Sequence, residues 1–106
     1  MSIDREKVKE VIAFAENDYD SYKILTTTYF DNLKRKRLNG TYDKAKSGKL
    51  LEYYYSNYVR KEMIKPRKYG FDSKLNPQER KMFGTYFANV LWSDYIKNIK
   101  PKPKKK

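Results

Sequence analysis

Apolar residues recur at intervals of three and four along nearly the whole chain, and this spacing limits most strongly the folds open to it. The clearest run lies near the end of the chain and comprises Phe83, Tyr86, Phe87, Val90 and Leu91. Asn76 and Pro77 precede this run and Glu79 follows them, an order typical of a helix start. The spacing and the start signal together predict a helix from about residue 77.

Two segments in the first half of the chain show the same periodicity. The first begins at Asp4, a residue type that caps helices, and its apolar positions are Val8, Val11, Ile12 and Ala15. The second ends at Asn39 and Gly40, a pair that stops helices, and its apolar positions are Tyr22, Leu25, Tyr29 and Leu33. Threonines at positions 26–28 favour a strand locally, against the helical spacing around them.

A third segment begins at Asp43 and predicts a helix that fades at Met63, before Pro66. Its apolar stripe comprises Ser47, Leu50, Leu51, Tyr54, Tyr55 and Tyr58. Residues 64–76 predict a loop, because Pro, Gly and Asn interrupt the pattern. We therefore expect an all-α fold, with a single domain of about four helices at 1–99 and a flexible, basic, Pro/Lys-rich tail at 100–106.

Composition excludes several classes of chemistry. The chain has 106 residues, enough for one domain, and its 39% hydrophobic content is too high for a disordered protein. It has no Cys and no His, which rules out disulfides, thiolate or imidazole zinc sites, and nucleophile pairs that need His. Glu16, Asp18 and Asp20 are close enough in sequence to suggest a Mg²⁺ site, but no second acidic motif accompanies them. We expect a protein that is not an enzyme and carries no cofactor and no metal.

Positive charge is large and unevenly distributed. The formal net charge is +12. Residues 1–20 carry three basic and six acidic side chains, residues 21–70 carry thirteen and four, and residues 71–106 carry nine and three. Such a field attracts polyanions, so DNA or RNA is the first partner to consider and an acidic protein surface the second. A lysine excess that reflects only AT-rich coding remains open.

One face of the third predicted helix combines bases with an aromatic ring. At 100° per residue this face comprises Lys46, Lys49, Tyr53, Ser56 and Arg60. Cations so spaced can meet successive phosphates, and a ring or hydroxyl between them can stack on a base or bond to the backbone. A solvated helix face without a ligand is the alternative interpretation.

A second basic cluster comprises the consecutive residues Lys34, Arg35, Lys36 and Arg37 at the end of the second predicted helix. Cations in a last helical turn also complement the helix dipole, so part of this cluster is explained without a ligand. The tail bases Lys102, Lys104, Lys105 and Lys106 could add phosphate contacts or only solubility.

The last predicted helix has a second apolar row, with Ala88, Trp92, Tyr95 and Ile99. A helix that is apolar on two sides is either central in its domain or part of an interface. Trp92, Tyr95 and Ile99 are therefore candidate contacts for a protein partner or a homodimer, and burial of Trp92 in the same core is the alternative.

The chain resembles a group of small uncharacterised bacteriophage proteins. The resemblance rests on Asn17, Asp18, Tyr22, Asn32, Leu33, Lys36, Arg37, Gly40, Tyr42, Asp43, Lys46, Lys49, Leu50 and Tyr54, and on an early Arg in the final helix, here Arg80. Ser47 and Gly48 depart from the group, which usually has Ala and another helix former there. The resemblance implies phage origin and a place in the cytoplasm of an infected bacterial host. It supplies no activity.

We therefore expect a non-enzymatic, phage-encoded accessory protein that binds DNA or RNA without sequence preference, through phosphates, on a basic helical face. The alternatives are a phage inhibitor or adaptor that binds an acidic surface of a host protein, for example one of anti-phage defence, and a minor virion component. We expect no membrane association, because no apolar stretch approaches the length needed to span a bilayer.

Overall fold

A computed structural model of the chain describes residues 3–101, and within that range every regular element is helical, which confirms the all-α prediction. The elements are α1 (Arg5–Asn17), α2 (Tyr19–Ile24), η1 (Leu25–Tyr29), α3 (Phe30–Asn39), α4 (Lys44–Tyr54), η2 (Tyr55–Val59), α5 (Arg60–Ile64), α6 (Pro77–Asp94) and η3 (Ile96–Asn98). Two of these, η1 and η2, are single π-helical segments inside longer helices, so residues 3–101 form four helical rods and a short 3₁₀ turn. Most of the predicted tail, residues 102–106, lies outside the described range.

Capping residues set the helix boundaries where the sequence predicts them. The side chain of Asp4 accepts a hydrogen bond from the Lys7 amide at 3.1 Å, at the start of α1. Asn76 and Glu79 form a complete capping box at the start of α6. Gly40 ends α3 in the left-handed conformation, with φ of 77°, which glycine adopts without a steric penalty.

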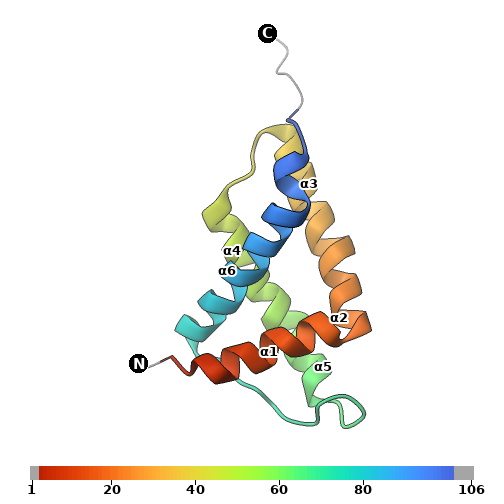
Figure 1. Cartoon of the computed structure of the whole chain (residues 1–106), viewed down its shortest axis with the longest axis vertical. Coiled ribbons are helices and arrows are strands. Elements are labelled where there is room, and N and C mark those ends of the chain that lie inside the picture. Colours follow the sequence, from red (N-terminus) through yellow and green to blue (C-terminus); the bar gives the residue numbers. More distant parts are fainter. Residues whose placement is uncertain (1–2, 102–106) are drawn as a thin grey trace.

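The rods form a flattened, roughly triangular arrangement (Figure 1). In that view α1 runs across the lower part above α5 and the loop that follows it, α2 and α3 rise along one side, and α4 and α6 cross in the middle. Helices α4 and α6 share the most extensive contact in the fold. They approach so closely that a Cβ atom added at Gly84 would lie 2.3 Å from the carbonyl oxygen of Gly48.

Aromatic residues of α4, η2 and α6 fill the centre of the core. The rings of Tyr54, Phe83 and Phe87 contact one another with centroid separations between 4.9 and 5.9 Å. Tyr54 also donates a hydrogen bond from its hydroxyl to the Ser21 carbonyl at 2.7 Å, which joins α4 to α2. Of the stripe predicted for α6, Phe83, Phe87 and Leu91 are fully buried, while Tyr86 stays partly exposed.

The π-helical segments differ from the simple helical periodicity assumed from the sequence. The threonines that favour a strand lie in η1, where Thr26 and Thr27 donate from their hydroxyls to carbonyls of the preceding turn. In η2 the wider turn shifts the buried side by one position, so that Val59 and Met63 are buried and Tyr58 is only partly so.

Within residues 3–101 there is no helix with both the length and the apolar character needed to cross a lipid bilayer.

Candidate nucleic-acid interface

The lysines at the start of α4 point toward solvent, because the Asp43 cap sets where the helix begins and buried residues set which side faces the core. Asp43 accepts hydrogen bonds from the amides of Ala45 at 2.9 Å and Lys46 at 3.2 Å. On the inner side of α4, Ser47 and Leu51 are buried. Lys46, Lys49 and Tyr53 consequently lie on the exposed side of the helix, as the periodicity predicts.

A third lysine reaches the same surface from α3. Gly40 reverses the chain, and the Thr41 amide donates to the Lys36 carbonyl at 2.9 Å, so the end of α3 lies next to the start of α4. The resulting open hollow has a volume of about 380 Å³ and is lined by Lys36, Ala45, Lys46, Lys49, Leu50 and Tyr53. We call it the lysine hollow. Three of its lining residues carry positive charge and none carries negative charge.

A second hollow continues from the first across Tyr53. It has a volume of about 330 Å³ and is lined by Lys49, Glu52, Tyr53, Ser56, Asn57 and Arg80. We call it the Arg80 hollow. Because Lys49 and Tyr53 line both hollows, the two are neighbours along α4, and we refer to them together as the groove.

Arg80 also lines this groove, but the periodicity of α4 could not predict it. It belongs to α6, and its guanidinium is held by a hydrogen bond from Nη1 to the Leu75 carbonyl at 2.9 Å. The close crossing of α4 and α6 at Gly48 and Gly84 carries it to the Arg80 hollow. Two small residues, one in each helix, are a signal for such close packing, but only once the two helices are known to cross.

The other three residues of the predicted Lys34–Arg37 cluster lie elsewhere. Lys34 is exposed and lines neither hollow. Arg35 forms an exposed ion pair with Asp31, with 3.8 Å between Arg35 Nη2 and Asp31 Oδ2. Arg37 turns toward the end of the chain, where its Nε donates to the Ile99 carbonyl at 3.0 Å. The structure thus brings only Lys36 of this cluster to the lysine hollow.

Arg60 is also separated from the predicted row. Its guanidinium forms a two-pronged ion pair with the Asp72 carboxylate, with N to O distances of 2.6 and 2.8 Å. The cause is η2, because one extra residue in a turn rotates everything after it by about 100° about the helix axis. This rotation turns Arg60 away from Tyr53 and toward the loop, and the ion pair raises the pKa of Arg60 further.

The residues predicted for a protein interface are partly used inside the fold. Trp92 stacks on Tyr42 with 5.3 Å between ring centroids, and the guanidinium carbon of Arg37 lies 5.1 Å from the Trp92 ring centroid. Trp92 and Ile99 are half-buried. The exposed fraction of Tyr95 is 38%, and its ring packs on one side against Phe30.

Two acids of the suggested metal site do meet, together with a third from another helix. Carboxylate oxygens of Asp18, Asp20 and Glu62 all lie within 4.8 Å of one another. The Lys68 ammonium contacts all three, at 2.9 Å from Asp18, 3.0 Å from Asp20 and 2.5 Å from Glu62. Glu16 instead accepts a hydrogen bond from the Tyr86 hydroxyl at 3.0 Å. A cation bound at this cluster would have to displace Lys68.

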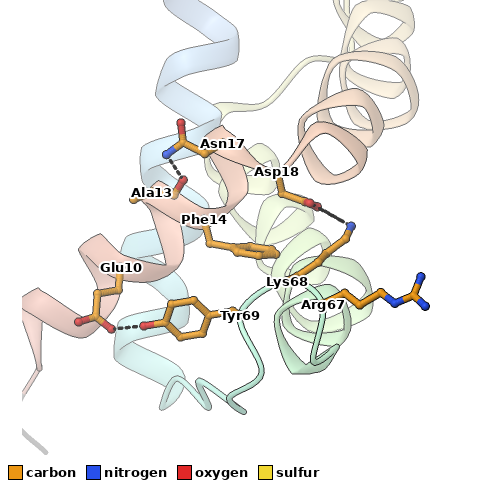
Figure 2. A pocket seen from close by; sticks show the side chains of 8 residues that line it. All are labelled: Glu10, Ala13, Phe14, Asn17, Asp18, Arg67, Lys68 and Tyr69. Atoms are coloured by element: carbon orange, nitrogen blue, oxygen red, sulfur yellow. Dashed lines mark hydrogen bonds and ion pairs between the residues drawn. The ribbon is translucent and has the colours of Figure 1, made fainter.

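Lys68 also lines an open hollow beside α1 (Figure 2). Figure 2 shows Phe14 between two polar contacts, the ion pair of Lys68 with Asp18 and the hydrogen bond from the Tyr69 hydroxyl to Glu10. Both acids of this wall are therefore engaged by residues of the loop. These contacts fasten the loop between α5 and α6 to the first helix.

The consecutive tyrosines at positions 53–55 have very different surroundings. Burial raises the pKa of Tyr54 and of Tyr55, and both hydroxyls donate to backbone carbonyls, those of Ser21 and Ser73. Tyr53 keeps 53% of its surface exposed. Two of the three hydroxyls therefore hold the fold together, and only the ring of Tyr53 is open to a ligand.

Comparisons of the chain with protein-family models, with curated protein sequences and with solved structures return no match. The arguments about function below therefore rest on the chain's own residues and their geometry.

Proposed function

We propose that this protein is a non-enzymatic accessory protein that binds DNA or RNA through phosphates, with the lysine hollow as its main contact. The observation that carries the proposal is the meeting of Lys36, Lys46 and Lys49, from two helices, around one hollow without an acidic lining residue. Cations gathered in this way meet adjacent phosphates of a single backbone, which scattered lysines do not.

The expected binding is electrostatic and depends on salt. Neutralised phosphates release condensed counterions, so the affinity falls as salt concentration rises. For a contact of this kind without sequence preference, we expect a Kd on the order of 1 to 100 µM at physiological salt. The resemblance to small phage proteins supports placing this activity in the cytoplasm of an infected bacterium.

The test is a pair of charge-reversal variants with the same net charge. Lys46→Glu with Lys49→Glu changes the lysine hollow, whereas Lys9→Glu with Lys23→Glu changes two exposed helical lysines outside it. Fluorescence anisotropy with a labelled oligonucleotide measures binding, and circular dichroism checks the fold. We expect at least a tenfold loss for the first variant and a much smaller loss for the second. Equal losses would mean that only the overall charge matters.

A protein partner is the second candidate function, and the partial exposure of Tyr95 beside the half-buried Trp92 and Ile99 supports it. Tyrosine and tryptophan are enriched at the centres of protein interfaces. A pull-down from bacterial lysate after nuclease treatment separates the two candidates. A stoichiometric protein that persists, and that is lost with Tyr95→Ala, would favour an adaptor over a nucleic-acid-binding protein.

A further inference from the structure

We propose that the groove along α4 selects single-stranded over double-stranded nucleic acid, with one base stacked on Tyr53. This inference rests on the proposed function and names the form of the ligand. It follows from the side chains that line the groove together with its cations.

The exposed ring of Tyr53 is the first reason. Tyr54 and Tyr55, its neighbours, are 0% and 1% exposed, whereas Tyr53 is 53% exposed and forms the shared wall of the two hollows. Stacking of a base on an exposed ring is the usual contact of proteins with single strands. In a duplex the base faces are already covered by their neighbours, so a duplex offers this ring nothing to stack on.

The floor of the lysine hollow is the second reason. The residues that line the hollow besides its three lysines are Ala45, Leu50 and Tyr53, and we call their mostly apolar surface its floor. Leu50 packs against the core from this position, so the floor is fixed. A surface that met only the phosphates of a duplex would have no use for an apolar floor, whereas an unstacked base or its sugar covers it.

The composition of the Arg80 hollow is the third reason. It contains the Glu52 carboxylate as well as Lys49 and Arg80, and its remaining polar groups are the Ser56 hydroxyl and the Asn57 amide. A carboxylate repels a phosphate but accepts hydrogen bonds from the amino groups of bases. We therefore assign phosphates to the lysine hollow and a base edge to the Arg80 hollow, with Tyr53 between them.

The length of the groove limits the site to a few nucleotides. From Lys46 to Asn57 the helix rises about 16 Å at 1.5 Å per residue. At about 3.4 Å per nucleotide, the spacing of a fully stacked strand, this is room for at most roughly five nucleotides. A 12-nucleotide probe is therefore long enough to fill the site.

The experiment compares one labelled 12-nucleotide DNA strand of mixed sequence, the same strand annealed to its complement, and its RNA equivalent, all at low salt. We expect the wild-type protein to bind the single strands at least tenfold more tightly than the duplex. Tyr53→Leu should weaken single-strand binding by about 5- to 100-fold and leave duplex binding nearly unchanged. Tyr53→Phe keeps the ring and should retain single-strand binding.

The outcomes separate the two proposals. Duplex binding that equals or exceeds single-strand binding, or single-strand binding unaffected by Tyr53→Leu, would overturn the single-strand inference and leave phosphate binding in place. No binding of any probe would overturn the proposed function itself. Single-stranded DNA and RNA both offer unpaired bases on a phosphate backbone, and binding of either one more tightly than the duplex supports the inference.

Discussion

Gly84 is the residue whose substitution tests the close crossing of α4 and α6 most sharply. A Cβ atom at this position would lie 2.3 Å from the Gly48 carbonyl oxygen and 3.1 Å from the Glu52 amide nitrogen. Since carbon and oxygen pack no closer than about 3.3 Å, the two helix backbones must separate by about 1 Å. Such overpacking costs roughly 1 to 3 kcal/mol, and the higher helix propensity of alanine offsets about 1 kcal/mol of it.

The difference is about 0 to 2 kcal/mol. We predict that Gly84→Ala falls in the upper half of that range and lowers the free energy of unfolding by about 1 to 2 kcal/mol, because the backbone atoms in its way cannot rotate aside. In a domain of this size that change lowers the Tm by on the order of 5 to 15 °C. Urea denaturation followed by circular dichroism at 222 nm measures it.

Gly48→Ala is the matched control for the same crossing. Its new Cβ would lie 3.8 Å from Thr85 Oγ1, an ordinary contact, so we expect stability to be unchanged or to rise by up to about 1 kcal/mol. The prediction is that Gly84→Ala lowers the free energy of unfolding, whereas Gly48→Ala leaves it unchanged or raises it. A Gly84→Ala variant as stable as wild type would refute the close approach of the helices, and with it the position of Arg80 beside Tyr53.

Three further predictions concern contacts that hold the rods together. Lys68→Met removes the ammonium partner of Asp18 and leaves Glu62 with Lys65 alone, whose Nζ lies 2.5 Å from Glu62 Oε2. We expect a loss of about 1 to 3 kcal/mol in urea denaturation, whereas an unchanged midpoint would show that the ion pairs of Lys68 contribute nothing. Burial alone would raise the pKa of Asp18 and of Glu62, but hydrogen bonds outweigh it and lower both pKa values. Asp18 accepts from Ser21 and Lys68, and Glu62 accepts from Lys65 and Lys68. The stability that these carboxylates contribute is present above their unfolded pKa and is lost as pH falls through the lowered folded values. Urea denaturation measured from pH 6 to pH 2 should therefore show the free energy of unfolding falling below about pH 4. The decrease should be smaller in Lys68→Met. Tyr54→Phe removes a buried hydrogen bond to a carbonyl of α2 and should cost about 1 to 2 kcal/mol, whereas Tyr53→Phe should change stability by less than about 0.5 kcal/mol.

Helix positions could be predicted from the sequence because their signals are local. Asp4, Asp43 and Asn76 each bond to amides within three residues, and Gly40 stops α3 through its own backbone conformation. Such contacts need no knowledge of the rest of the fold. The buried stripes of α1, α4 and α6 follow from the same periodicity, which is why Leu51 and its neighbours were predicted on the inner side.

The π-helical segments could not be predicted, since a wider turn is set by packing between helices. The sequence places Arg60 in the row of Lys49 and Tyr53 only if the helix keeps 3.6 residues per turn. In the structure η2 interrupts that period, and Asp72, twelve residues further along the chain, engages Arg60. A contact across a loop of this kind carries no periodic signal.

The candidate site could be predicted only in part, because some of its residues share one helix and others come from elsewhere in the fold. Lys46, Lys49 and Tyr53 share one helix, so their common face follows from spacing alone. The position of Lys36 beside α4 depends on the turn at Gly40, and the position of Arg80 beside Tyr53 depends on the crossing of α4 and α6. The sequence gives no crossing angle, so it could not separate Lys36 from Arg37, which turns toward Trp92 instead.

The salt dependence of single-strand binding tests most directly whether cations gathered in the lysine hollow hold the ligand. Three phosphate contacts predict a slope of roughly −2 for log affinity against log salt concentration, at about −0.7 per contact. Lys46→Gln with Lys49→Gln should make the slope shallower by about 1 to 1.5, whereas Lys9→Gln with Lys23→Gln should leave it unchanged. An equal change of slope in both variants would contradict a defined phosphate site on α4.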